Sequence, residues 1–252
     1  MKMYPLGVGG AFTKSNFHNN YILQLNKTNL LIDAGTTLRN SITEANFSYT
    51  DIDFVYISHL HFDHVGGLEE MIMQRYWQFI NGQHSPQKTK IIVHENLLLP
   101  LKKLLCNGLE NQDHTIEDFC SFITLSDGEV YKIEDYEFSL FDTTNAHVKG
   151  MPSSGFKLSW QEGNIVFTGD IKWMDQVNIL NKIDINTVAI FQDISFTSNG
   201  VHASIQEVLN YYPTTLHGKL YGMHYNDNIE QFNDMLSQTN ITLVKKHGVL
   251  EF

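Results

Sequence analysis

The segment Ser58-His59-Leu60-His61-Phe62-Asp63-His64 gives the strongest indication of the fold, because it places three histidines and one aspartate within six residues. Residues two apart in an extended chain point the same way, so His59 and His61 can direct two imidazoles at one ion. Asp63 and His64 then turn toward a second position, and imidazole with carboxylate suits zinc, manganese or iron. A histidine-rich surface loop is the plain alternative. The segment nevertheless follows an apolar strand and precedes a glycine-led helix, which is the context of a built site.

The apolar runs before and after this segment predict a mixture of strands and helices. One helix is expected to begin near residue 37, and others are expected over residues 68–79, 96–105, 204–212 and 228–238. Pro100 interrupts the helix 96–105 early, and a capping box from Ser204 to Glu207 begins the helix 204–212. Residues 106–127 show no clear pattern. The expected strands are 21–25, 30–32, 54–58, 91–93, 136–141, 155–160, 165–168, 188–192, 219–223 and 242–245. This order indicates a layered α/β sandwich, and no stretch resembles a linker, so we expect one domain over residues 1–252.

Composition narrows the class of partner. Hydrophobic residues make up 42% of the chain, enough for a sizeable core, and the net charge is -11. Of the 17 basic residues only Arg39 and Arg75 are arginines, whereas proteins that grip long nucleic acids carry a basic face. Cys106 and Cys120 lack the spacing of a metal finger or a disulfide framework. With no signal-peptide stretch and no membrane-length apolar run, we expect a cytoplasmic protein that binds a small substrate and neither nucleic acid nor membrane.

The His-x-His-x-Asp-His pattern after a strand resembles the signature of the metallo-β-lactamase superfamily. This resemblance implies an αββα sandwich, two mixed β-sheets flanked by helices, with further ligands at strand ends. Three segments resemble those later motifs: Asp142-Thr-Thr-Asn-Ala-His147, Val166-Phe-Thr-Gly-Asp170 and Leu220-Tyr-Gly-Met-His224. The implied ligand sets are His59, His61 and His147 for one divalent ion, and Asp63, His64 and His224 for a second, with Asp170 bridging both. We expect Zn²⁺, with Mn²⁺ as the alternative.

Two further segments concern the reaction. Gln192-Asp193-Ile-Ser-Phe196 and Gly200-Val-His202-Ala-Ser204 resemble the Glu-Ala-Thr-Phe and His-Ser-Thr motifs of the ribonuclease Z branch. In that branch a carboxylate–histidine pair protonates the leaving group, while two metals lower the pKa of a shared water to about 7. Asp63 would orient or deprotonate the nucleophile. Here Asp193 is one methylene shorter than the usual glutamate. The plain alternative is that Asp193 caps a turn and His202 merely precedes a helix.

The opening of the chain indicates which phosphodiester is cleaved. Pro5-Leu-Gly-Val-Gly-Gly-Ala-Phe12, Phe17-His-Asn-Asn-Tyr21 and Asp33-Ala-Gly-Thr-Thr37 resemble the phage and bacterial anti-Pycsar phosphodiesterases. That family degrades cyclic CMP, cyclic UMP and related cyclic nucleotides, which implies a 3′,5′-cyclic nucleotide substrate and, for a phage protein, a host cytoplasm. The alternatives are a ribonuclease-Z-type tRNA 3′ endonuclease and a lactonase or thioesterase. The segment 96–122 carries an acidic stretch and is a poor RNA clamp. We expect a helical lid or ordinary packing there.

Several residues outside these motifs allow two interpretations. His18 and Asn20 would contact substrate at the rim or form a polar loop pair, and His94 is expected to be a packed strand-end histidine. His84, His114, His217 and His247 are expected at the surface or in loops. The predicted helix 68–79 is apolar around more than one stripe, which favours a homodimer interface or deeper burial within one chain.

Overall fold

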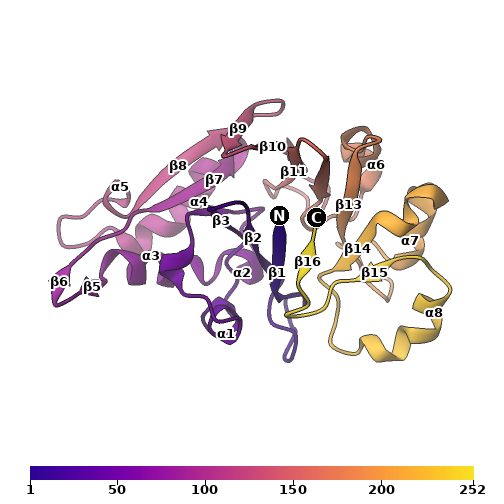
Figure 1. Cartoon of the computed structure of the whole chain (residues 1–252), viewed down its shortest axis with the longest axis horizontal. Helices are drawn as coiled ribbons and strands as arrows, with labels where there is room; N and C mark the ends of the chain where they lie inside the picture. Colours follow the sequence, from indigo (N-terminus) through magenta and orange to yellow (C-terminus); the bar gives the residue numbers. More distant parts are fainter.

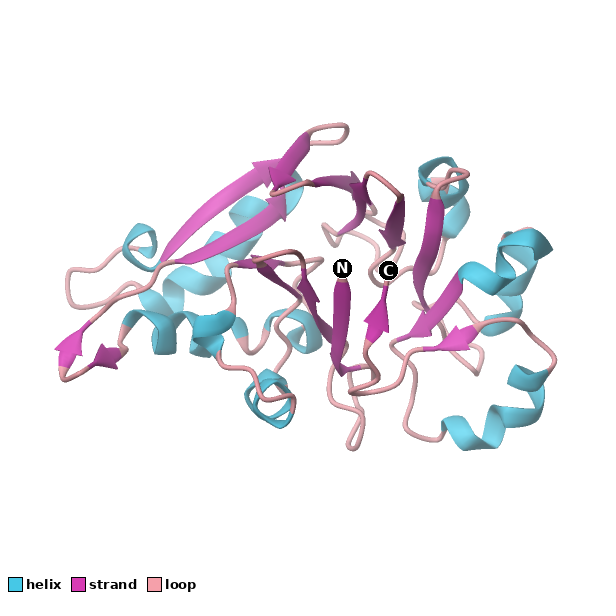
Figure 2. Cartoon of the chain, viewed as in Figure 1, coloured by secondary structure: helices cyan, strands magenta, loops and turns pink.

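Two seven-stranded mixed β-sheets, with helices on their outer sides, make up the architecture of this computed structural model, which describes residues 1–252 (Figure 1). Figure 2 shows the strands of both sheets between the helices of the N-terminal half and those of the C-terminal half. The expected αββα sandwich is therefore confirmed. No helix is both long and apolar enough to cross a membrane.

The first sheet has the order β16-β1-β2-β3-β4-β7-β8 and the second the order β15-β14-β13-β12-β11-β10-β9. Strands of the first sheet are β1 (Lys2–Gly7), β2 (Asn20–Gln24), β3 (Asn29–Ile32), β4 (Phe54–Tyr56), β7 (Thr89–His94), β8 (Cys120–Leu125) and β16 (Leu250–Glu251). Those of the second are β9 (Val130–Ile133), β10 (Tyr136–Asp142), β11 (Ser154–Trp160), β12 (Gly163–Phe167), β13 (Thr187–Asp193), β14 (Leu220–Met223) and β15 (Thr242–Leu243). Strands β5 (Phe79–Ile80) and β6 (Gln83–His84) form a separate hairpin.

The α-helices are α1 (Leu38–Glu44), α2 (Phe62–Val65), α3 (Leu68–Tyr76), α4 (Glu95–Leu109), α5 (Ile116–Phe119), α6 (Met174–Val177), α7 (Ile205–Tyr211) and α8 (Asn233–Ser237). Four 3₁₀ turns complete the set, at Tyr49–Asp51, Ile179–Lys182, Thr214–Lys219 and Ile229–Phe232. The capping box of Ser204 and Glu207 begins α7 as predicted. The predicted helix 228–238 is instead a 3₁₀ turn followed by the short α8.

Alternation along the strands divides the core into two layers. In β2, Tyr21 and Leu23 belong to the cluster between the sheets, whereas Ile22 faces the helices α1, α3 and α4. Successive strand residues point to opposite faces, so a sheet covered on both sides carries apolar residues continuously. This explains why β2 and β3, the predicted first hairpin, show an unbroken apolar run on each side of the turn at 25–28.

Strand direction gathers the functional loops at one edge of the sandwich. Strand β3 runs parallel to β4, and β12 runs parallel to β13 and β14. The carboxyl ends of parallel strands lie together, and in open α/β sheets ligands bind outside those ends. The segment His59–His64 follows β4, Asp170 follows β12, and His224 follows β14. The fold therefore brings loops from both sheets to the same place.

Two predicted helix boundaries were wrong. Helix α3 ends at Tyr76 with Trp77 as its C-cap, and residues 79–84 form the β5–β6 hairpin, whose turn residues Asn81 and Gly82 both have positive φ. Asn-Gly is the preferred pair for that turn. Pro100 lies inside α4 without ending it. The missing hydrogen bond costs about 3 kcal/mol. Four leucines spaced about one turn apart are buried on one side of α4, namely Leu97, Leu101, Leu105 and Leu109. Burial of each stabilises the fold by about 1.5–3 kcal/mol, which offsets the cost of the proline.

The unassigned region 106–127 contains the end of α4, the short α5 and strand β8, which pairs in parallel with β7. Ile116 and Phe119 of α5 are buried in the same core layer as the α4 leucines. Of the two interpretations of segment 96–122, ordinary packing is therefore the one that the structure supports.

Candidate metal centre

All of the side chains that the sequence predicted for the site come together in space. They form three overlapping groups with ligand atoms within 4.8 Å of one another: His59, His61, His147 and Asp170; Asp63, His64, Asp170 and His224; Asp170, Asp193, His202 and His224. The first two groups are the two sets implied by the resemblance. The third adds the pair Asp193 and His202 to the same centre. These side chains come from the ends of five strands, β4, β10, β12, β13 and β14, or from the loops that follow them.

Asp170 is at the middle of the cluster. Its Oδ2 atom lies 3.3 Å from His64 Nε2 and 3.2 Å from His224 Nε2. The same oxygen is 3.9 Å from the Nε2 atoms of His59 and His147, and 3.8 Å from His202 Nδ1. Gly169, with φ of 65°, makes the turn after β12 that delivers this carboxylate. A buried oxygen facing five imidazoles is the geometry expected of a residue shared between two ions.

The histidines are held so that one ring nitrogen of each is fixed by the protein. A carboxylate or carbonyl oxygen can only accept, so His64 donates Nδ1–H to Asp33 at 2.7 Å and His147 donates Nδ1–H to the carbonyl of Val201 at 2.7 Å. His59 Nδ1 lies 3.0 Å from Ser58 Oγ, which itself donates to Asp33 at 2.7 Å. The Nε2 atoms of His59, His64 and His147 therefore face the cluster, as the coordinating nitrogens of metal-ligating histidines do.

The donor set fits divalent cations. Three buried polar atoms in the cluster have no hydrogen-bond partner: Asp63 Oδ1, His64 Nε2 and Asp170 Oδ1. Buried polar groups are almost always paired, so three orphans in one place indicate a missing partner of positive charge. Burial lowers the pKa of His59 well below its usual value and that of His147 to about 4, which keeps both imidazoles neutral for ligation.

The carboxylates of the cluster are ionised. Burial by itself would raise the pKa of Asp170, but the imidazoles of His224 and His64 outweigh it and hold that pKa well below its usual value. For Asp63, burial is likewise outweighed by His64 and by the contact with His224 Nε2 at 3.1 Å, and its pKa is lowered. Asp63 and Asp170 thus place two carboxylates, each at 3% exposure or less, in one buried cluster, where a divalent cation would balance their charge.

Asp193 and His202 form a hydrogen-bonded pair at the edge of the cluster. His202 donates Nδ1–H to Asp193 Oδ2 at 2.8 Å, so the shorter side chain reaches its partner. The backbone explains the reach, because Ser195 N–H donates to the carbonyl of Ala203 at 2.8 Å and draws the two segments together. Burial opposes protonation of His202, but the bond to Asp193 and the charge of Asp170 raise its pKa. Turn capping alone therefore does not describe Asp193.

Three residues behind these pairs were not predicted from the sequence. Asp33 accepts hydrogen bonds from Ser58 N–H, Ser58 Oγ and His64 Nδ1, each at 2.7 Å. On the other side, Tyr212 OH donates to Gln192 Oε1 at 2.9 Å, and Gln192 Nε2 donates to Asp193 Oδ1 at 2.9 Å. An aspartate between a buried strand and a glycine was the available signal for Asp33. No local pattern indicates that Tyr212 lies behind the pair.

The remaining predicted positions lie outside the cluster. His18 and Asn20 are buried and bonded within the chain, His18 Nδ1 to Thr36 Oγ1 at 3.2 Å and Asn20 Oδ1 to Gly35 N–H at 3.2 Å. His94 is a packed strand-end histidine, as predicted, and its Nδ1 also accepts from Asn96 N–H to cap α4. The four others are exposed or half-buried, as expected: His84, His114, His217 and His247.

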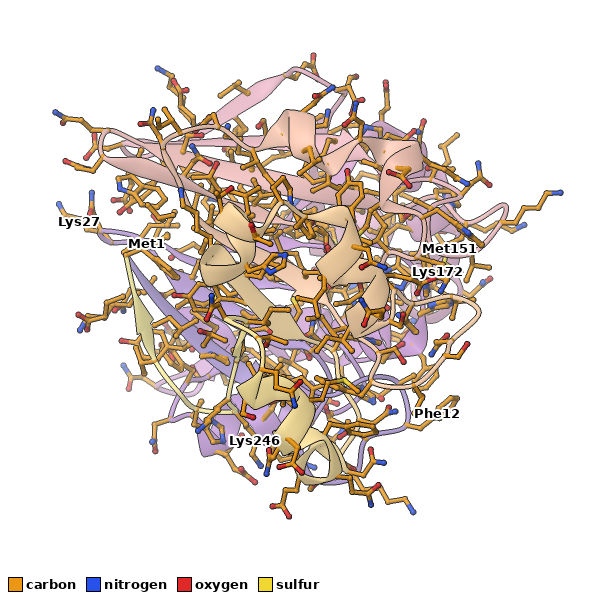
Figure 3. All side chains as sticks on the ribbon, turned by 90° about the vertical axis from the view of Figure 1, so that its right-hand side faces the viewer. Met1, Phe12, Lys27, Met151, Lys172 and Lys246 are labelled. Atoms are coloured by element: carbon orange, nitrogen blue, oxygen red, sulfur yellow. The ribbon has the colours of Figure 1, made fainter.

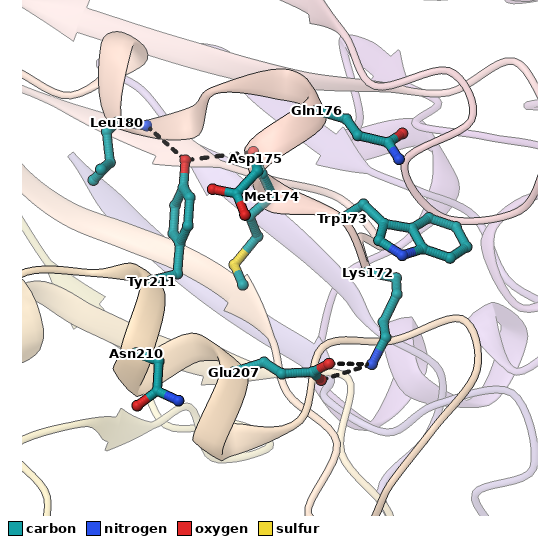
Figure 4. A pocket seen from close by; sticks show the side chains of 9 residues that line it. All are labelled: Lys172, Trp173, Met174, Asp175, Gln176, Leu180, Glu207, Asn210 and Tyr211. Atoms are coloured by element: carbon teal, nitrogen blue, oxygen red, sulfur yellow. Dashed lines mark hydrogen bonds and ion pairs between the residues drawn. The ribbon is translucent and has the colours of Figure 1, made fainter.

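Two cavities open on the C-terminal half of the chain. The one of 310 Å³ adjoins the cluster and is lined by His202 and His224 together with Phe12 and the loop residues around it. The larger one, of 580 Å³, lies between α6 and α7 (Figure 4). In this larger cavity Lys172 Nζ bonds both carboxylate oxygens of Glu207 at 2.7 and 2.6 Å. Of these two cavities, the smaller one adjoins the cluster that holds the unpartnered buried atoms of Asp63, His64 and Asp170.

Comparisons with known proteins agree with this geometry. A model of the family described as "Anti-Pycsar protein Apyc1" matches residues 1–250. The protein of that name from Paenibacillus sp. (strain J14) is 29% identical over 253 residues, covering 99% of this chain and 98% of its own length. The one from Bacillus phage BSP38 is 31% identical over 239 residues, covering 90% of each. The metallo-β-lactamase fold protein YhfI from Bacillus subtilis superposes with a TM-score of 0.71 at 15% identity, covering 99% of both chains. This chain belongs to the anti-Pycsar protein Apyc1 family and has the metallo-β-lactamase fold.

Proposed function

We propose that this protein is a metal-dependent phosphodiesterase that hydrolyses 3′,5′-cyclic nucleotides, cyclic CMP and cyclic UMP among them, and so counters Pycsar antiphage signalling. One observation carries the proposal: Asp170 Oδ2 faces five imidazole nitrogens within 4 Å, and one of these belongs to the Asp193–His202 pair. Family membership supports the choice of substrate, because the relatives are anti-Pycsar proteins.

The residues divide into ligands and proton carriers. In this proposal His59, His61 and His147 hold one divalent ion, Asp63, His64 and His224 hold a second, and Asp170 contacts both. Such ions, Zn²⁺ in the first place, would polarise the phosphate oxygens and lower the pKa of water at the centre. The Oδ1 atom of Asp63 is buried without a partner and is the acceptor at hand for a proton of the attacking water.

The ribose oxygen that leaves phosphorus needs a proton as the phosphorus–oxygen bond breaks. His202 is suited to give it, because Asp193 fixes Nδ1–H and leaves Nε2 for the substrate, while the ring lines the 310 Å³ cavity. The raised pKa of His202 favours the protonated form that a donor needs. Water's oxygen joins phosphorus, the ring opens, and the product is a linear mononucleotide.

Chromatography of products from 3′,5′-cyclic CMP, UMP, AMP and GMP, with added Zn²⁺ or Mn²⁺, tests the proposal. We expect turnover by the wild type and at least a hundredfold loss in His61→Ala. His217→Gln is the matched control, since His217 is half-buried outside the cluster and bonds only the carbonyl of Tyr212. Cleavage of precursor tRNA without turnover of any cyclic nucleotide would replace this proposal by the endonuclease alternative. Hydrolysis of lactones or thioesters without turnover of any phosphodiester would replace it by the lactonase or thioesterase alternative.

A further inference from the structure

An exposed phenylalanine stands at the mouth of the cavity beside the cluster. Phe12 is 89% exposed, lines the 310 Å³ cavity with His202 and His224, and projects from the edge of the molecule in Figure 3. Its ring centroid lies 6.3 Å from that of Phe62, which is 47% exposed and sits between His61 and Asp63. Phe62 itself lines a separate cavity of 230 Å³. Single exposed apolar residues are ordinary, but two neighbouring exposed rings, one of them lining the cavity beside the cluster, are not explained by packing.

The loop that carries Phe12 is held firmly. The carboxylate of Asp227 accepts from Thr13 Oγ1, from Lys14 N–H at 2.6 Å and from Asn16 Nδ2 at 2.9 Å, so it ties the loop 10–17 to the loop after β14. Gly10 lies against His224, since a Cβ there would come within 3.1 Å of the imidazole. The backbone that carries Phe12 is thus tied to the loop of His224, a proposed metal ligand.

The chemistry of the cavity lining complements this ring. None of its residues is a lysine or arginine, and its polar members are histidine, serine and asparagine side chains, among them Ser195, Asn199 and Asn226. A volume of 310 Å³ is at the lower end of the range of about 300–1,000 Å³ typical of small-molecule sites. With the phosphate directed to the cluster, the flat base of a nucleotide must extend outward, where Phe12 offers an aromatic face.

We propose that Phe12, with Phe62 beside it, is the base-stacking residue of the site and binds the nucleobase of the cyclic nucleotide. This inference rests on the proposed function. Stacking uses the π-face that every base has, so Phe12 contributes affinity without selecting among bases. Base preference would come from the asparagine and serine side chains of the same cavity.

The test is steady-state kinetics of Phe12→Ala and Phe12→Trp on cyclic CMP, UMP, AMP and GMP. Loss of one base–aromatic stack should raise KM about 5- to 100-fold for all four substrates in Phe12→Ala, with kcat nearly kept and KM restored in Phe12→Trp. Phe79→Ala is the matched control, because Phe79 is 65% exposed on the β5–β6 hairpin. A base-free ribose 3′,5′-cyclic phosphate should be hydrolysed equally by the wild type and Phe12→Ala.

The outcomes separate this inference from the proposed function. Turnover of cyclic nucleotides by the wild type together with unchanged KM in Phe12→Ala would overturn the stacking role alone. An equal loss on the base-free phosphate would also overturn it, because Phe12 would then act on the cluster and not on the base. Absence of any turnover by the wild type, with bound metal present, would overturn the proposed function. Circular dichroism of Phe12→Ala should match the wild type, as expected for so exposed a side chain.

Discussion

Replacing Asp33 by asparagine should weaken metal binding about 10- to 100-fold without unfolding the protein. Asp33 is fully buried with φ of 57°, a conformation that asparagine adopts readily, and the two side chains have nearly the same volume. Alanine at this φ would add backbone strain and confuse the result. The change therefore isolates the role of the carboxylate behind His64.

The magnitude follows from the hydrogen bonds. Asp33 Oδ1 accepts from Ser58 N–H, and Oδ2 accepts from both Ser58 Oγ and His64 Nδ1. An amide has one acceptor atom, so in either orientation its NH₂ group faces a donor. If the NH₂ replaces Oδ2, His64 must carry its proton on Nε2, the atom that faces the cluster. Residues behind metal ligands contribute about 10- to 100-fold to metal affinity, which corresponds to about 1.4–2.8 kcal/mol.

Competition of the protein with a chelator of known affinity measures the dissociation constant for Zn²⁺, and Asp53→Asn is the control. Asp53 is an exposed carboxylate that accepts only from Asn29 N–H and bonds no residue of the cluster. A zinc affinity of Asp33→Asn within twofold of the wild type, at unchanged fold, would refute the reasoning. The ring orientation of His64 would then not depend on Asp33.

Three further predictions concern the reaction, stability and assembly. His202→Gln should slow hydrolysis of cyclic nucleotides about 10²- to 10⁴-fold but spare bis-p-nitrophenyl phosphate, whose leaving group needs no proton; equal losses on both substrates would contradict a proton-donor role. Burial would raise the pKa of Asp184, but hydrogen bonds from Lys157, Asn164 and Asn186 N–H outweigh it and lower that pKa to about 2, so the stabilisation from these contacts is present above the ordinary pKa near 4 and is lost as the pH falls toward 2. Thermal melts should therefore show Asp184→Asn less stable than the wild type at pH 7, by under about 1 kcal/mol for so exposed a pair, with the difference shrinking below pH 4; a constant difference would exclude this ion pair as its cause. We also propose a homodimer, for which light scattering should give about twice the 28.9 kDa of one chain, and a mass near 28.9 kDa would exclude it.

The sequence allowed the cluster to be predicted because its chemistry is concentrated. His59 to His64 fall in one short loop, and the other members stand directly after apolar strands, where side chains meet at one edge of a sandwich. Long-range pairing offered no such signal: β1 pairs with β16, which places Lys2 opposite Glu251. Local propensity also predicted wrongly that Pro100 would interrupt its helix. The cost of a proline could be estimated from the sequence, but the burial of the leucines around it could not.

The backbone conformation of two site residues was not predictable from the local sequence. Asp33 and His224 both have positive φ, at 57° and 58°, and each follows a strand whose end faces the cluster. A left-handed backbone at a residue other than glycine is sparsely populated and persists only where the surroundings determine it. At Asp33 the surroundings are three hydrogen bonds; at His224 they include the carboxylates of Asp63 and Asp170.

The carboxylates of Asp63 and Asp170 each leave one oxygen buried without a partner, so the native fold accepts an electrostatic cost that a bound cation would relieve. A sequence selected for stability alone would have no reason to keep strain and unpaired charge together at one edge of the sandwich. Their coincidence is the physical reason for treating this edge as the seat of the chemistry.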